Sequence, residues 1–287
     1  MQGQGFAGLR VLSLESRRAR EMADLIAKNG GRPVVAPSTQ ELPIGSNPEV
    51  LNFISELLAG QFHCVIFLTG VGARLLANEA EAVCSRERFT AALARTTVVA
   101  RGPKPVAVLR ELGVPVGLTV PEPNTWREIL EALDQRSDQI RLNGRRIAVQ
   151  EHGVPSAELL DGLRERGAEV IPVRVYRWAL PTDVAPLQAA VGALTRHEID
   201  VALFTSSVQL QHLLQVAEQM NLQREVISAL SHVVVGSIGP VTSEELRQHG
   251  IAVDLEPEHP RMGFLVRETG ERAANVLRKK KHVAAES

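Results

Sequence analysis

Polar residues that could bind an anion follow many of the apolar segments of this 287-residue sequence. Arg17, Arg101 and Lys104 provide positive charge, and such side chains bind carboxylates and phosphates. Neighbouring glycine, serine and threonine residues provide N–H groups and hydroxyls, which bind anions at helix N-termini. The segments concerned are Leu14–Arg17, Thr69–Gly72, Ala100–Lys104, Glu151–Gly153, Thr205–Ser207 and Gly236–Thr242. Any single serine or threonine could instead be a helix N-cap, so the interpretation depends on the whole set.

Tyr176 is the only tyrosine of the chain, and it follows the apolar stretch Val170–Val175. A phenol can donate a proton in general acid catalysis or hold a water molecule through hydrogen bonds. A tyrosine at the end of a strand can equally be a half-buried packing residue. Tyr176 is therefore a candidate proton donor, and the packing interpretation stays open beside it.

Several common catalytic and cofactor-binding motifs are absent from the sequence. There is no GxxxxGK[ST] phosphate loop, and no GxGxxG fingerprint follows a strand. The eight histidines show no HExxH or other metal-ligand spacing, and no GxSxG nucleophile motif occurs. We therefore expect neither a metal nor a cofactor.

Apolar segments of strand length alternate with longer segments of helical periodicity, which predicts parallel sheets covered by helices. The predicted strands are 9–14, 34–35, 65–68, 96–100, 116–120, 146–150, 169–175, 200–204, 232–235 and 251–255. Ligands of such sheets bind beyond the carboxyl ends of the strands, where the polar segments begin. The predicted fold class is α/β, with doubly wound parallel sheets.

The sequence also contains an internal duplication. IFLTG at Ile66–Gly70 aligns with ALFTS at Ala202–Ser206 at an offset of 136 residues, which pairs Thr69 with Thr205. Arg101–Val114 aligns with 238–251 at an offset of 137 residues. General similarity among α/β units would not keep the offset nearly constant. We therefore expect two similar domains with a ligand cleft between them.

The composition excludes several classes of function. Hydrophobic residues make up 44% and charged residues 23% of the chain, as in globular proteins. A formal net charge of -1 argues against a protein that coats nucleic acid or an anionic membrane. No apolar run approaches the roughly 20 residues of a membrane span, and two cysteines make no disulfide framework. The start of the sequence lacks the pattern of a secretory signal, so we expect a cytoplasmic protein.

Six segments occur in the order that one family of α/β enzymes shows. They are FLTGVGARLL (67–76), ARGPKPVAVLRELG (100–113), PVRVYRWALP (172–181), FTSSVQLQHLL (204–214), VGSIGPVTSEELRQHG (235–250) and EHPRMGFLV (258–266). On these segments the chain resembles the uroporphyrinogen-III synthase family. Their order, the duplicated plan and the length together make the resemblance specific.

The resemblance implies a fold in which the first βαβ unit joins the carboxyl-terminal part of the chain. Residues 1–38 and 182–274 would form one domain and 42–176 the other, joined by two extended linkers. These linkers would lie near Ser38–Glu41 and Arg177–Pro181, and residues 275–287 are expected to be a solvated basic tail. We expect a monomer, because the duplication already supplies two facing domains.

The resemblance also implies a reaction, that of a cyclising hydro-lyase. Hydroxymethylbilane, a linear tetrapyrrole with eight carboxylates, would lose water and close to uroporphyrinogen III with its last ring inverted. The hydroxymethyl group leaves with a proton, and the resulting azafulvene cation is attacked by the terminal pyrrole. The spiro intermediate then fragments and recloses. This chemistry needs no cofactor, and catalysis would come mainly from holding the substrate bent.

By the same resemblance, Tyr176 matches the family tyrosine proposed to assist loss of the hydroxyl group. Loop positions that match the family's cleft would bind acetate and propionate groups, and these are Thr69, Gly70, Thr205, Ser206, Ser237, Gly239 and Thr242. Arg17, Arg101, Gly102 and Lys104 join them as candidates from the same loops. The chain departs from the family at Lys104–Pro105, where some members have threonine.

Two other functions stay open on the sequence alone. A non-enzymatic ligand-binding or regulatory protein of the same two-domain shape would hold a tetrapyrrole without changing it. A nucleotide-using α/β enzyme is the other alternative, and the missing phosphate loops argue against it.

Overall fold

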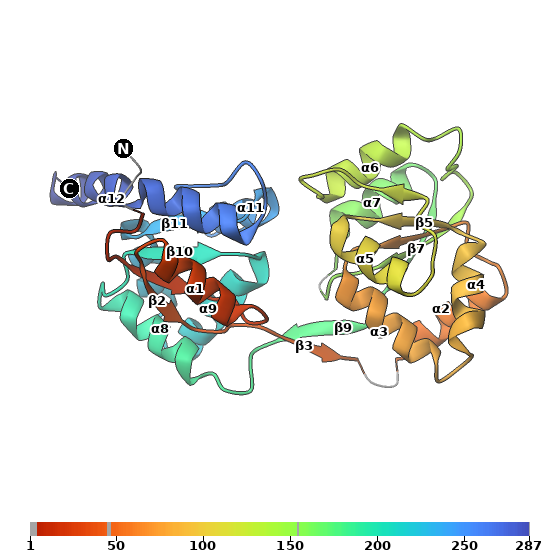
Figure 1. Ribbon diagram of the computed structural model, residues 1–287, viewed down its shortest axis with the longest axis horizontal. Coiled ribbons are helices and arrows are strands. Elements are labelled where there is room, and N and C mark those ends of the chain that lie inside the picture. Colours follow the sequence, from red (N-terminus) through yellow and green to blue (C-terminus); the bar gives the residue numbers. More distant parts are fainter. Residues whose placement is uncertain (1–4, 45–46, 154, 287) are drawn as a thin grey trace. The chain divides into compact units, whose positions relative to one another are not determined.

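The polypeptide crosses between two structural units twice, near residues 40 and 178. The computed structural model describes residues 5–44, 47–153 and 155–286. Unit 1 combines Met1–Gln40 with Ala179–Ser287, and unit 2 is Glu41–Trp178. In Figure 1 the red amino-terminal and blue carboxyl-terminal segments accordingly belong to the same unit. The predicted α/β class with parallel sheets is confirmed.

Unit 2 is built on a five-stranded sheet of order β6-β5-β4-β7-β8, in which all neighbours pair in parallel. Its elements are α2 Pro48–Leu58, β4 Cys64–Phe67, α3 Gly70–Ala80, α4 Arg86–Ala94, β5 Thr97–Ala100, α5 Pro103–Glu111, β6 Leu118–Thr119, α6 Trp126–Asp134, β7 Arg146–Gln150, α7 Ala157–Glu165 and β8 Glu169–Val173.

Unit 1 is built on a four-stranded sheet of order β11-β10-β1-β2, which is also parallel throughout. Its elements are β1 Arg10–Ser13, α1 Ala19–Lys28, β2 Arg32–Val35, α8 Ala185–Thr195, β10 Val201–Phe204, α9 Ser207–Gln219, α10 Gln223–His232, β11 Val234–Ser237, α11 Pro240–Gln248 and α12 Met262–Glu286. The predicted strand at 251–255 is wrong, because only Leu255 forms a bridge there, with Gly236.

The two sheets repeat one arrangement. The order β11-β10-β1-β2 corresponds to β5-β4-β7-β8, with β6 added at the edge of unit 2. Strands β10 and β11 and helices α9, α10 and α11 each begin 137 residues after β4, β5, α3, α4 and α5. The duplication expected from the sequence is therefore present in the topology, and it extends across both sheets.

The uniform offset corrects one residue pair of the sequence alignment. At 137 residues, Thr69 corresponds to Ser206 and not to Thr205, and both residues are helix N-caps. Matching threonine to threonine put this segment one residue out of register. The reason is that β4 and β10 both end at a phenylalanine, Phe67 and Phe204, and the loops follow from there.

Each sheet is buried on both faces, because its strands send alternate side chains into two separate cores. In β10, Ala202 and Phe204 pack with helices α8 to α11, whereas Val201 and Leu203 pack with α1 and α12. Unit 2 divides in the same way, with α2 to α5 on one face and α6 and α7 on the other. The strands therefore read as continuous apolar runs.

The two linkers contain strands of their own, β3 Gln40–Pro43 and β9 Tyr176–Ala179, which pair as a two-stranded sheet (Figure 1). The sequence predicted extended linkers at these places. Tyr176 differs from the prediction in one respect: it begins β9 and does not end the strand before it.

The segment expected to be a solvated basic tail continues α12 instead. The helix runs from Met262 to Glu286, and Ser287 lies outside the described residues. Lys280 is only 17% exposed, and its Nζ lies 2.5 Å from Asp254 Oδ2 and 2.7 Å from the Val233 carbonyl oxygen. Asp254 also accepts a hydrogen bond from the Val235 N–H, so the lysine fastens α12 to the edge of β11. Among the described residues, no helix is long and apolar enough to cross a membrane.

This contact generates a prediction about stability. Lys280→Met should lower the free energy of unfolding by about 1–3 kcal/mol, because it leaves the largely buried Asp254 carboxylate without its cation. Denaturant unfolding measures the change. Lys281→Met, at an exposed position of the same helix turn, is the matched control and should unfold like the unmodified protein. Equal effects of the two substitutions would contradict a structural role for Lys280.

Candidate functional site

Three adjacent strands of unit 2 end in the same row of the sheet. Phe67 is the Cα partner of both Ala100 and Gln150, and these three residues are the last of β4, β5 and β7. The chain segments that leave the strands carry Thr69, Arg101 and His152. Parallel pairing in register therefore brings these three side chains to one carboxyl edge, and Tyr176 follows β8 at the same edge.

Tyr176 occupies a tightly packed position at this edge. Its side chain is 2% exposed, and its hydroxyl oxygen lies 3.4 Å from Thr69 Oγ1. Its ring meets the Trp178 ring edge to face, with centroids 5.6 Å apart and an interplanar angle of 84°. Trp178 Nε1 donates a 2.8 Å hydrogen bond to the His152 carbonyl oxygen, which ties β9 to the end of β7. The phenol is thereby held in one orientation.

Gly153 allows this packing. It has a φ of +88°, and a Cβ at this position would lie 2.7 Å from Tyr176 Cε2 and 2.8 Å from Trp178 Cδ1. Only glycine fits both the backbone conformation and the space beside the two rings.

The electrostatics of the edge are set by burial and by Arg101. Burial, reinforced by the positive charge of Arg101, lowers the pKa of His152 from 6.5 to about 3, so the imidazole stays neutral near neutral pH. Its Nδ1 lies 3.1 Å from Ser156 Oγ. Burial also lowers the pKa of Arg101, while the Tyr176 phenol opposes that change. Arg101 and Tyr176 are therefore close enough to interact electrostatically.

Glu151 is the carboxyl group of the same loop, and it is 1% exposed. Burial raises its pKa, while the hydrogen bond from the Ser156 N–H and the positive charge of Arg174 act in the opposite direction. The Ser156 N–H donates to Glu151 Oε1 at 2.8 Å, and Arg174 Nε lies 3.8 Å from Oε2. Glu151 is thus engaged on the side of Arg174.

Gln150 links the strand ends of β4 and β7. Its Oε1 accepts a 3.3 Å hydrogen bond from the Thr69 N–H, while Thr69 Oγ1 accepts one of 3.0 Å from the Gly72 N–H. A Cβ at Gly72 would lie 1.9 Å from Gln150 Nε2, so this close approach requires glycine. Thr69 is therefore a helix N-cap as well as a neighbour of the phenol.

The carboxyl edge of unit 1 has a different set of contacts. Thr205 Oγ1 donates to Glu15 Oε2 at 2.6 Å, and the Thr205 N–H donates to Gln209 Oε1 at 2.7 Å. Ser237 is fully buried, and its Oγ donates to the Gly239 carbonyl oxygen at 3.1 Å. Ser243 bridges Ser237 to Glu256. The hydroxyls of this edge are largely engaged with acceptors of unit 1 itself.

Three helices nevertheless start at these edges without a side-chain cap. Their N-caps are Gly102 for α5, Ser206 for α9 and Gly239 for α11. The first N–H groups of a helix have no partner within the helix and carry its positive dipole end. A carboxylate can therefore bind at each of these N-termini.

All twelve residues proposed from the sequence lie at or next to the carboxyl edge of one sheet or the other. Thr69, Gly70, Arg101, Gly102, Lys104 and Tyr176 belong to unit 2, and Arg17, Thr205, Ser206, Ser237, Gly239 and Thr242 belong to unit 1. Arg17 and Lys104 are exposed, whereas Ser237 and Thr242 are buried at 0% and 4% exposure.

Sequence reasoning missed four residues of these edges. They are Gln150 and His152 in unit 2, and Glu15 and Gln209 in unit 1. Two of them lie within segments already singled out, Leu14–Arg17 and Glu151–Gly153. A histidine directly after a strand and before a glycine was a usable signal for His152. Gln209 gave none, because a glutamine in the first turn of a helix is usually solvated.

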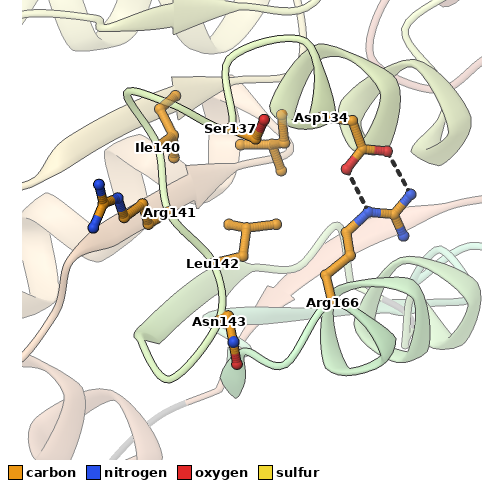
Figure 2. A pocket seen from close by; sticks show the side chains of 8 residues that line it. Asp134, Ser137, Ile140, Arg141, Leu142, Asn143 and Arg166 are labelled. Carbon is orange, nitrogen blue, oxygen red and sulfur yellow. Dashed lines mark hydrogen bonds and ion pairs between the residues drawn. The ribbon is translucent and has the colours of Figure 1, made fainter.

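A pocket of 490 Å³ lies at the opposite, amino edge of the sheet in unit 2 (Figure 2). Its lining includes Ile140 to Asn143, just before β7, and the Asp134–Arg166 ion pair, whose two hydrogen bonds are both 2.7 Å long. It contains none of the candidate residues. Among the described residues, no group of three histidine, cysteine or acidic side chains could hold a metal ion.

Comparisons with known proteins agree with this arrangement. Residues 20–267 match the family described as uroporphyrinogen-III synthase HemD. A putative uroporphyrinogen-III synthase of Methanothermobacter thermautotrophicus is 31% identical over 84% of this chain and 89% of its own length. An uncharacterized protein of Bacillus subtilis, YjjA, is 29% identical over 92% of this chain and 96% of its own length.

Solved structures show the same likeness. The crystal structure of a mutant uroporphyrinogen III synthase from Thermus thermophilus has a TM-score of 0.69 and 25% identity, covering 94% of this chain and 100% of that one. Uroporphyrinogen-III synthetase from Helicobacter pylori has a TM-score of 0.52 at 13% identity, covering 91% of this chain and 98% of its own, and it shares the fold.

Gly153→Ala tests the packing around Tyr176. We expect it to lower the free energy of unfolding by about 1–3 kcal/mol and to change the tryptophan fluorescence, because the new Cβ overlaps both rings and strains the backbone. Gly60→Ala is the matched control, with a φ of +74° and nothing within 4 Å of its Cβ. If both substitutions cost the same, the backbone alone accounts for the loss and the packing argument fails.

The state of His152 predicts a pH dependence. Unfolded His152 takes up a proton near pH 6.5 and folded His152 only near pH 3, so its contribution to stability is complete above pH 6.5 and is lost as the pH falls toward 3. In that window the stability of the unmodified protein relative to His152→Gln should fall by up to about 1.4 kcal/mol per pH unit. Above pH 7 the two profiles should run parallel. Parallel profiles down to pH 3 would show that His152 is not held neutral.

Proposed function

The chain belongs to the uroporphyrinogen-III synthase family, and on this basis we propose that it cyclises hydroxymethylbilane to uroporphyrinogen III. The reaction inverts the terminal ring and releases one molecule of water. The observation that carries the proposal is the position of Tyr176, whose phenol is fixed beside Thr69 and Arg101 at the carboxyl edge of unit 2.

Tyr176 is the proton donor in this proposal. Loss of the hydroxyl group from a hydroxymethyl pyrrole requires a proton on the leaving oxygen, and a phenol can supply it by general acid catalysis. The Trp178 ring and the glycine at 153 hold the phenol in place, which favours one direction of proton donation. The neutral His152 beside it does not compete as an acid near neutral pH.

The substrate's carboxylates are matched by the helix N-termini at the two sheet edges. Each unit would bind acetate and propionate groups at its own edge, through the N–H groups that follow Gly102, Ser206 and Gly239. Thr69, Gly70, Thr205, Ser237 and Thr242 would shape these edges, and the exposed Arg17 and Lys104 would add positive charge. Ser237 and Thr242 act indirectly in this scheme, because their side chains are buried.

We also propose that the protein acts as a cytoplasmic monomer. Support for the monomer comes from the duplication, since one chain already supplies two binding edges. Size-exclusion chromatography with light scattering tests it directly.

The reaction is tested by generating fresh hydroxymethylbilane in situ, oxidising the products to porphyrins and separating the isomers. Spontaneous closure gives the type I isomer, so type III product that depends on the protein supports the synthase. A well-folded protein that yields type I alone would refute it. The same protein binding a linear tetrapyrrole unchanged would then support the non-enzymatic ligand-binding alternative.

Tyr176→Phe tests the proton donor. The substitution removes the hydroxyl but keeps the ring against Trp178, so we expect kcat to fall by about 10²-fold with little change in stability. Ser55→Ala, which removes an exposed hydroxyl from α2, is the matched control and should keep full activity. Unchanged kcat in Tyr176→Phe would exclude Tyr176 as the acid.

A further inference from the structure

We propose that Arg101 acts through Tyr176, placing a fixed positive charge beside the phenol that stabilises the phenolate left after proton donation. This inference rests on the proposed function for its catalytic meaning. It gives Arg101 a role different from direct binding of a substrate carboxylate, and the two roles make different predictions.

Arg101 is held in position at its backbone. Its N–H donates a 3.0 Å hydrogen bond to the Phe67 carbonyl oxygen, two residues before Thr69, whose hydroxyl contacts the phenol. On the other side, the Asn124 amide, oriented with its nitrogen toward Arg101, donates to the Arg101 carbonyl oxygen at 2.7 Å. The residue therefore leaves β5 in a defined direction, and its charge acts on both Tyr176 and His152.

The charge of Arg101 is not cancelled by the groups around it. Within the part of the chain that the structure describes, no carboxylate lies within ion-pairing distance of its guanidinium. His152, from the end of β7, faces it as a neutral imidazole, and Thr69, from the start of α3, is uncharged. Glu151, the carboxyl group of the same loop, is bonded to the Ser156 N–H and lies near Arg174. A half-buried cation in this setting interacts strongly with a neighbouring anion.

The duplication supports the inference independently. At the offset that relates the two sheets, Arg101, His152 and Tyr176 correspond to Ile238, Ser16 and Thr39. In unit 1 the Ser16 and Thr39 hydroxyls lie 3.1 Å apart, and an uncharged isoleucine takes the position of Arg101. The phenol and the arginine therefore occur together in one copy of the frame and are both replaced in the other. This is the pattern expected if the two side chains work as a pair.

Atoms and electrons balance in the proposed step. The phenol proton moves from Tyr176 to the oxygen of the substrate's hydroxymethyl group, and the C–O bond breaks with its electron pair going to oxygen. Water leaves, an azafulvene cation remains on the substrate, and Tyr176 is a phenolate next to the Arg101 guanidinium. When the terminal pyrrole has attacked and the final ring loses its proton, that proton restores the phenol. Arg101 is a positioning residue in this step, because it acts on Tyr176 and not on the reacting atoms.

The test uses the fact that Tyr176 is the only tyrosine in the chain. Tyrosinate difference absorbance during alkaline titration, without substrate, therefore reports this phenol alone. We expect Arg101→Met to raise the titration midpoint by on the order of one pH unit, since an opposite charge within a few ångströms favours the ionised form. Arg101→Lys should retain part of the effect. Arg110→Met, which removes an exposed cation from the same helix α5, should leave the midpoint unchanged.

The same variants are then assayed for type III product. We expect Arg101→Met to lower kcat by about tenfold or more with a smaller change in KM, and Arg101→Lys to restore part of kcat. Arg101→Gln replaces Arg101→Met if the methionine variant does not fold.

Three results would overturn the inference even if the synthase is active. They are unchanged titration midpoints in the neutral variants, a phenol that stays neutral up to alkaline unfolding in every variant, and a raised KM with unchanged kcat. The last result would mean that Arg101 binds substrate. Absence of type III product from the unmodified protein overturns the proposed function, while the titration still decides whether Arg101 stabilises the phenolate.

Discussion

The common end of β5, β4 and β7 is the constraint on which the unit 2 site depends. Ala100, Phe67 and Gln150 are partners in one row, and each is the last residue of its strand. The residues that follow must therefore leave the sheet side by side. Arg101, Thr69 and His152 come together for this reason, although they are far apart along the chain. A shift of one residue in any of the three strands would turn its following side chain away.

Around that row the packing is as specific as the hydrogen bonding. Trp178 fixes the Tyr176 ring from one side and bonds to the His152 carbonyl oxygen, and the left-handed conformation of Gly153 leaves room for both rings. Burial keeps His152 neutral, so the positive charge beside the phenol is that of Arg101. The site thus owes its electrostatics to apolar neighbours as much as to charged ones.

The duplicated frame explains why only one edge carries this chemistry. Both sheets present uncapped helix N-termini at their carboxyl edges, so both can bind carboxylates. Unit 1 has Thr39, Ser16 and Ile238 where unit 2 has its tyrosine, histidine and arginine, and its hydroxyls bond to Glu15 and Glu256. The frame is shared, and the loop side chains have diverged.

The sequence by itself determined the α/β class, the duplication and the strand ends, because burial on both sheet faces writes each strand as an apolar run and leaves the polar loops visible. Tyr176, Thr69 and Arg101 stood out for that reason. It did not determine the exact register of the duplication, the helical end of α12 or the membership of Gln150 and His152 in the unit 2 edge. Those depend on which strands become neighbours and on side chains that meet across long stretches of chain. Such contacts have no local pattern, because their partners are chosen by the packing of the whole unit.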